Sequence, residues 1–188
     1  MIRRVEGFTK YIAIAGFTDV NIRHVDGLLK DVRENLGHVH VQFFDARFVA
    51  TDEHLYFAAL NALQAFEHGL NRSRNLAVEV MLYASAQRQI TNAVNLIGIT
   101  PDSNRVAIVI ISETEPEADA ALEMLSNLIE GQRKDAVLAL TDSKIATIRR
   151  LFGISDLELQ ASSAGRVSRE QALVDLVVEH VALLATER

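Results

Sequence analysis

Two short groups of polar residues have the types and spacing that chemistry requires, and the first is a histidine pair. His38 and His40 stand one residue apart, so on a strand both imidazoles project from one face, as two metal ligands do. The residues considered as a third ligand are His54, Asp45 and Asp52. A metal-dependent hydrolase is therefore one hypothesis. The alternative is a surface-facing pair that alternates with buried Val39 and Val41.

The second group is Gln87-Arg88-Gln89, directly after Ser85 and Ala86. Serine is a good N-cap, so we expect a helix to begin after Ser85 and to continue over residues 86–97. Arg88 then lies in the first helical turn, where the helix dipole disfavours a cation by about 0.3 kcal/mol or more. An arginine at that position needs a compensating partner.

Two kinds of partner for Arg88 stay open, and they are compatible. Glu79, in the apolar segment just before, is a candidate internal anchor. Alternatively, free N–H groups, a helix dipole and an arginine together suit a phosphate, with the glutamines available to base or sugar edges. The residues expected to face such a ligand are Ser85, Gln87, Arg88, Gln89, Arg72 and Arg74.

No pattern typical of catalysis is found in the chain. Phosphate-binding glycine loops, the G-x-S-x-G turn and the H-E-x-x-H zinc motif are all missing from the sequence. There is no cysteine, which excludes thiolate zinc sites and thiol nucleophiles. The carboxylate pair Asp52-Glu53 and the acidic run at 113–117 lie at expected helix starts, where negative charge is stabilising. The sequence therefore predicts a protein without enzymatic activity, cofactor or metal.

Composition limits the kind of partner. The 188 residues are 49% hydrophobic and carry a net charge of −6, which fits a single folded domain spanning 1–188. No apolar stretch approaches the roughly 20 residues that a membrane span requires, and the N-terminus lacks a secretory pattern, so we expect a cytoplasmic protein. Because an acidic chain is poorly suited to neutralising many phosphates, any nucleic acid contact should be small and local.

The expected elements alternate only partly between strand and helix. Strands are predicted at 11–16, 38–44, 106–111 and 136–140, with a brief extended piece at 157–159. Helices are predicted at 26–35, from 52 to a stop at Gly69, at 76–83, 86–97, 116–129 and 142–152, and after Ser168, where Gln171 completes a capping box. Thr51 is the expected N-cap of the second helix, whose inward stripe consists of Leu55, Ala58, Ala59, Ala62, Leu63 and Phe66. This indicates an α/β (α+β) fold in which helices pack on a small mixed β-sheet.

The last of these helices is more apolar than an ordinary surface helix. One helical stripe consists of Leu173, Leu176, Val177, Val181 and Leu184. A second apolar stripe adjoins it, so the apolar arc is unusually wide. Such a helix is either sandwiched within its own fold or covered by another protein, and its terminal position favours the partner.

A family resemblance rests on the block Val78-Glu79-Val80-Met81-Leu82-Tyr83-Ala84-Ser85-Ala86-Gln87-Arg88-Gln89-Ile90, followed by Ala93 and Ile97-Gly98. It resembles the signature of the smallest regulatory subunit of the KEOPS (EKC) complex, the PRPK-binding protein family. That family usually has a glutamate, several apolar residues and then Ser-Gly-Gln-Arg-Gln-Ile. The order of the flanking elements also matches, and the short chain suggests an archaeal member.

The resemblance implies an adaptor without an active site of its own. Members of the family bind and modulate the complex's atypical kinase-like ATPase, and meet other KEOPS subunits indirectly. They also hold the single-stranded 3′ CCA end of tRNA, which helps the complex to install threonylcarbamoyl-adenosine at position 37. On this basis the Gln87–Gln89 segment is expected to bind the tRNA end, and the stripe of the last helix to contact the kinase. A small-molecule sensor that uses Arg88 for an anion remains a third hypothesis.

Two departures from the family pattern affect what can be carried over. Ala86 replaces the usual glycine, so the turn is strained if that position requires a positive φ, whereas alanine is harmless inside a helical first turn. The segment 17–36 is longer than in compact archaeal members, and nothing is carried over there.

Overall fold

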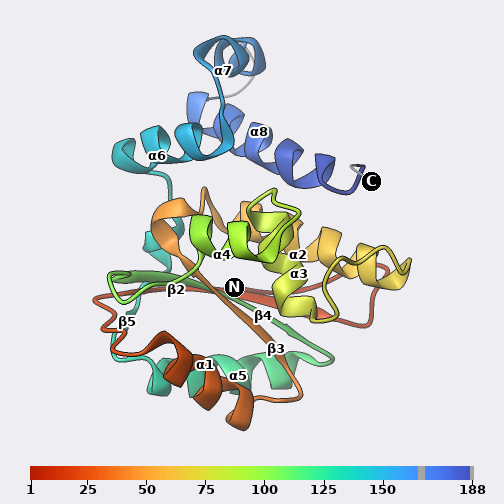
Figure 1. Ribbon diagram of the computed structural model, residues 1–188, viewed down its shortest axis with the longest axis vertical. Coiled ribbons are helices and arrows are strands. Elements are labelled where there is room, and N and C mark those ends of the chain that lie inside the picture. Colours follow the sequence, from red (N-terminus) through yellow and green to blue (C-terminus); the bar gives the residue numbers. More distant parts are fainter. Residues whose placement is uncertain (165–167, 187–188) are drawn as a thin grey trace.

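The computed structural model describes residues 1–164 and 168–186, in which helices cover both faces of a β-sheet (Figure 1). The strands are β1 (Ile2–Arg4), β2 (Tyr11–Thr18), β3 (His40–Asp45), β4 (Arg105–Ser112) and β5 (Gln132–Arg133). Their order is β1-β2-β4-β3, and β5 pairs with β2 beyond the end of β1. Every pairing is antiparallel, so the α+β class is confirmed, while the sheet is antiparallel rather than mixed.

The central strand β4 has the most apolar sequence because both of its faces are covered. Residues 106–111 are all buried, as a strand between two helical layers requires. On one face the sheet packs against α1 (Val25–Asn35) and α5 (Glu115–Leu128). On the other it packs against α2 (Asp52–Glu67), α3 (Leu76–Ala84) and α4 (Ile90–Ile97).

A further group of helices lies beyond α2 and forms the outer part of the molecule in Figure 1. It comprises α6 (Asp142–Phe152), α7 (Asp156–Ser163) and α8 (Arg169–Leu183). Besides the two cores on the faces of the sheet, these helices share a third core, which includes Ile148, Leu159, Leu173 and Val177. The chain returns along α8 to pack on α2, so the last helix joins the outer group to the central layers.

Several helix boundaries follow from capping chemistry. The Thr51 hydroxyl accepts a hydrogen bond from the N–H of His54 and starts α2, as predicted. Ser168 does the same for α8 through the N–H of Gln171, but the predicted capping box is not completed, because the Gln171 amide donates to the Asp175 carboxylate instead. Thr114 and Glu117 form a reciprocal capping box at the start of α5.

Three predicted elements are wrong. Residues 136–140 were expected to form a strand, but Asp135–Leu138 is a 3-10 helix, η2, which follows β5. The predicted extended piece at 157–159 lies inside α7, because Ser155 and Glu158 form a capping box that nucleates a helix. The helix expected from Ala86 begins only at Ile90. A second 3-10 turn, η1 (Ala46–Phe48), connects β3 to the approach of α2.

No helix in the described part of the chain is both long enough and apolar enough to cross a membrane.

Candidate functional site

The loop before α3 is held in place by one buried carboxylate. Glu79 is fully buried, and its two oxygens accept hydrogen bonds from the backbone N–H groups of Arg72, at 3.1 and 3.0 Å, and Ser73, at 2.6 Å. A charged acceptor in a low-dielectric interior must be satisfied in this way. Glu79 therefore anchors the backbone of Arg72 and Ser73, whereas the sequence analysis considered it as an anchor for the Arg88 side chain. Among the described residues no hydrogen bond or ion pair joins it to Arg88, so the predicted Arg88–Glu79 pair is wrong.

The turn between α3 and α4, residues 85–89, ends one helix before it starts the next. The N–H of Ala86 donates to the Tyr83 carbonyl and the N–H of Gln87 to the Leu82 carbonyl, both at 3.0 Å. This is the Schellman arrangement, which requires a left-handed residue after the C-cap, and Ala86 adopts it with φ +50°. The strained alternative considered for Ala86 is thus the observed one, at a cost of about 1–2 kcal/mol relative to a relaxed backbone.

Ser85 has a different role from the one predicted. It is the C-cap of α3, and its hydroxyl donates to the carbonyls of Met81 and Leu82, at 2.8 and 3.1 Å. Because Ser85 is buried and satisfied, it does not face a ligand as it stands. Arg88 lies in the turn before α4 and not in its first helical turn, so the expected conflict with the helix dipole does not arise.

The structure brings Arg72 and Arg88 to the wall of one cavity of about 850 Å³. Tyr83 of α3 also lines it. The α2 side contributes Asn61, Gln64 and His68, and the remaining lining residues are Ala65, Leu70, Ala185 and Thr186. We call this cavity the arginine groove. Its guanidinium, amide and imidazole groups are suited to phosphate, sugar and base edges.

Arg72 is fixed from two sides. Its backbone is held by Glu79, and its guanidinium donates to the Leu184 carbonyl, at 2.9 Å, near the end of α8. A cation at the carbonyl end of a helix is favoured by the helix dipole. Burial raises the pKa of the Tyr83 hydroxyl, with the charge of Arg72 acting in the opposite direction, so the phenol is protonated at neutral pH and can donate.

The other residues predicted to bind RNA do not line the arginine groove. Gln87 is half-buried, and Arg74 and Gln89 are exposed nearby in the chain. Tyr83 and the polar residues of α2 were missed by the sequence analysis. The sequence could have shown that the α2 residues share a face, because positions 61, 64 and 68 fall on one side of a helix, opposite the predicted inward stripe.

The stripe of α8 that was predicted to contact a kinase lies inside this protein. Leu173, Val177 and Val181 are completely buried, Leu184 is 2% exposed, and Leu176 is half-buried. Leu173, Leu176 and Val177 pack into the core that α6, α7 and α8 share, and Val181 and Leu184 pack into the core that α2 and α3 form with the sheet. That kinase assignment is therefore corrected: four of the five side chains are covered by their own chain and cannot contact a partner as they stand.

The histidine pair does not form a metal site. β3 begins at His40, and His38 lies in the turn before it, so the two do not share a strand face. Of the proposed third ligands, Asp52 lines another cavity, and the other two are engaged with partners of their own. Asp45 pairs with Arg47 at 2.6 Å, and the buried His54 accepts from Ala50 N–H and donates to the Ala84 carbonyl. Within residues 1–164 and 168–186 no three metal-binding side chains gather.

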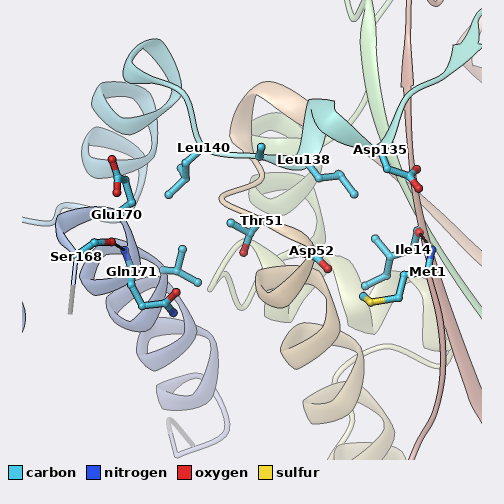
Figure 2. Close-up of a pocket in the computed structure, with 12 residues that line it drawn as sticks. Met1, Ile14, Thr51, Asp52, Asp135, Leu138, Leu140, Ser168, Glu170 and Gln171 are labelled. Carbon is cyan, nitrogen blue, oxygen red and sulfur yellow. Dashed lines mark hydrogen bonds between the residues drawn. The ribbon is translucent and has the colours of Figure 1, made fainter. Parts of the chain in front are cut away.

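A second cavity, of about 470 Å³, lies where the starts of α2 and α8 face the segment around η2. Figure 2 shows Asp135 beside Met1 and Ile14 at one end, Glu170 and Gln171 at the other, and Thr51 and Asp52 between them. Its ionisable side chains are acidic, and the Asp135 carboxylate accepts the N–H of Gly16 at 3.0 Å. Among the described lining residues, three carboxylates outnumber the one cation, the Met1 ammonium, which disfavours a phosphate, and no nucleophile is paired with a base.

The family model described as kinase binding protein CGI-121 matches residues 17–185. Regulatory protein Cgi121 of Methanocaldococcus jannaschii is 30% identical over 145 residues, which is 77% of this chain and 89% of that protein. EKC/KEOPS complex subunit CGI121 of Candida glabrata is 29% identical over 103 residues, or 55% of this chain and 58% of that protein. The first of these names describes a regulatory protein and the second a subunit of a complex.

Proposed function

Because the chain belongs to the kinase binding protein CGI-121 family, we propose that it is a non-catalytic regulatory subunit that binds the atypical kinase of an EKC/KEOPS complex. The membership confirms the resemblance read from residues 78–98. The names of the Candida and Methanocaldococcus relatives support the regulatory role. The aligned segment spans less than two thirds of the Candida protein, at 58%, so that protein's assembly is carried over here as a proposal.

The kinase contact is proposed for the outward side of α8. Leu183 is 48% exposed there, next to exposed Ala182. The exposed acidic residues Glu179 and Asp175 lie one and two turns earlier in the same helix. An apolar centre with a polar rim is the usual composition of a protein interface. The proposed kinase contact therefore stays on the last helix, but it uses this exposed side in place of the buried stripe.

Co-purification with the kinase subunit tests this part of the proposal. Wild-type protein should retain the kinase on an affinity column, and Leu183→Glu should lose most of it while its unfolding midpoint stays unchanged. Ser126→Glu, on α5 on the opposite face of the sheet, is a control with the same added charge. If wild-type protein retains no kinase, the proposed regulatory function is contradicted. If Leu183→Glu retains it fully, only the proposed surface fails.

The second activity that we propose is holding the 3′ CCA end of tRNA in the arginine groove. The observation that carries it is the meeting of Arg72 and Arg88, from separate segments, with Tyr83 in one cavity. Two guanidinium groups neutralise backbone phosphates, while the amides of Asn61 and Gln64 offer both donors and acceptors to bases. Unstacked single-stranded ends expose the base edges that such groups read.

The acidic character of the chain fits this local contact. With a net charge of −6, the protein is unsuited to a long duplex, but a short tail needs few cations. In this proposal the groove presents the tRNA to the complex that installs threonylcarbamoyl-adenosine at position 37. The chain itself supplies no catalytic group to that reaction.

Binding of intact tRNA and of tRNA trimmed of its CCA end separates this proposal from general RNA affinity. We expect trimming to weaken binding by about tenfold or more, the equivalent of one lost charge-assisted contact. Equal affinity for the two RNAs would remove the CCA-end assignment and leave the kinase-binding function standing.

A further inference from the structure

A small cavity of about 270 Å³ at the start of α6 gathers three cationic side chains. Arg47 comes from η1, Arg105 from the first residue of β4, and Lys144 from the first turn of α6. Two hydroxyl residues, Ser143 and Thr147, complete the polar part of the wall. Arg47 and Phe48 precede the N-terminus of α2, whereas the arginine groove is lined by the C-terminal half of that helix, from Asn61 onward, so the two cavities are separate.

Lys144 is the unusual member of the group because it is buried and, among the described residues, has no counter-ion within ion-pair distance. It is 7% exposed, and its ammonium donates to the carbonyls of Val137 and Leu138, at 3.1 and 3.4 Å. An ammonium has three N–H donors, so one is left for another acceptor. Burial and the nearby Arg105 lower the pKa of Lys144 to about 8, which still leaves it charged at neutral pH.

The charges of the cavity do not balance. The Arg47 guanidinium is neutralised by Asp45, through hydrogen bonds of 3.0, 3.1 and 2.6 Å. In the part of the chain that the structure describes, neither Lys144 nor Arg105 forms an ion pair. Two positive charges therefore share one cavity, and each disfavours the other unless an anion lies between them.

We propose that this cavity is a binding site for a single phosphate group, held by Lys144 and Arg105 with help from the Ser143 hydroxyl. A phosphate offers several acceptor oxygens and close to two negative charges, which match two cations and a hydroxyl donor. Ser143 and Lys144 also stand in the first turn of α6, where backbone N–H groups lack intrahelical partners and Thr141 provides no side-chain cap.

The volume favours one phosphate group over a whole nucleotide, since sites for drug-sized ligands span about 300–1,000 Å³. The group can come from a small phosphate ester or from the backbone of an RNA. These two sources present the same chemistry to the cavity and are separated by the competitors used in the test. The site does not depend on the proposed function of the arginine groove.

Titration calorimetry with inorganic phosphate, at constant ionic strength, tests the site in the full chain. Wild-type protein should bind phosphate, and Arg105→Gln, at an exposed position that should not disturb folding, should weaken binding by about tenfold. Lys144→Met, which removes the buried charge but keeps the length of the side chain, should do the same. Arg23→Gln, an exposed arginine of the opposite face, should match the wild type.

Loss of binding in both cavity variants, with Arg23→Gln unaffected, supports the site. Displacement of phosphate by a short RNA with hydroxyl ends then assigns the backbone as its source, and displacement only by a nucleoside monophosphate assigns a small ester. No measurable phosphate binding by wild-type protein, or equal binding by Arg105→Gln, would overturn the proposal.

Discussion

The turn between α3 and α4 and the buried stripe of α8 differ in what holds their side chains. In the turn, the backbone is fixed by hydrogen bonds from residues 86 and 87, which leaves the Arg88 side chain exposed at the groove. In α8, the side chains themselves are fixed, and Leu173, Val177 and Val181 have no exposed surface. A contact site for another molecule needs the first arrangement, whereas a stable core needs the second.

His54 joins these two regions. Its ring donates to the Ala84 carbonyl, at 2.7 Å, one residue before the turn. The same ring packs edge-on against Phe152 of α6, with centroids 5.6 Å apart, and Phe152 in turn contacts His180 of α8 at 5.9 Å. The comparison therefore predicts which substitutions destabilise the whole fold, which affect both regions and which affect only the turn.

The largest effect is expected in the α8 stripe. Val177→Asp places a charge without a partner in a fully buried position, so it should lower the free energy of unfolding by about 4 kcal/mol or more. Urea denaturation measures this. The control Glu179→Gln, at an exposed position of the same helix, should change stability by less than about 0.5 kcal/mol. A folded, fully stable Val177→Asp protein would show that the stripe is not core.

The next effect is a pH dependence at the junction. Burial lowers the pKa of His54 from 6.5 to about 4, so the folded protein keeps the ring neutral while the unfolded chain takes up a proton first. This contribution to stability is complete above pH 6.5 and decreases as the pH falls toward 4, by up to about 3 kcal/mol.

Denaturation at several pH values tests this, with His54→Gln as the matched variant. Glutamine keeps one donor and one acceptor but does not titrate, so its stability should fall less between pH 6.5 and pH 4 than that of the wild type. Parallel curves for the two proteins would contradict the assignment of the pH dependence to His54.

A smaller effect is expected at the support of the arginine groove. Glu79→Gln replaces a charged acceptor of three backbone hydrogen bonds by a group that is partly a donor, and should cost about 2 kcal/mol. It should also weaken binding of the tRNA end, although Glu79 does not line the groove, because it positions the backbone of Arg72. Unchanged RNA binding in a destabilised variant would limit Glu79 to a structural role.

The smallest effect concerns the turn itself. Ala86→Gly removes the strain of φ +50° at the cost of a more flexible unfolded chain, so we expect a gain of about 0.5 kcal/mol. Thermal unfolding measures this gain. A loss of stability would mean that the methyl group of Ala86, which packs beside the third core, contributes more than the strain costs.

Much of the fold could be predicted from the sequence, because at these places the local residue pattern agrees with the burial that the fold imposes. The apolar run at 106–111, the Thr51 cap and the inward stripe of α2 each predict what the structure contains. Residues 136–140 look like a strand by composition, but their place is set by tertiary contact. Gly16 of β2 lies so close to this segment that a Cβ there would be 2.5 Å from Val137, and the N–H of Lys134 donates to the Gly16 carbonyl.

The site was predictable in part, and for physical reasons. The Gln87-Arg88-Gln89 motif indicated a segment of which one residue, Arg88, lines the arginine groove. Ser85 fits the sequence of an N-cap as well as that of a C-cap, and Ala86 gives no sign of a left-handed turn. The partner of Glu79 is backbone, which no residue pattern reveals. The meeting of Arg72 with Arg88 depends on how the loop before α3 folds back, and a wide apolar arc on α8 cannot by itself tell a core from an interface.

The most direct test of the central claim compares Arg88→Glu with Arg23→Glu, the same charge reversal on the opposite face of the sheet. Affinities are measured for intact tRNA and for tRNA trimmed of its CCA end. We expect Arg88→Glu to weaken binding of intact tRNA by about tenfold or more and to leave trimmed tRNA nearly unaffected, with Arg23→Glu close to wild type on both. Equal losses on the two RNAs, or equal losses in the two variants, would contradict the assignment of the arginine groove to the tRNA end.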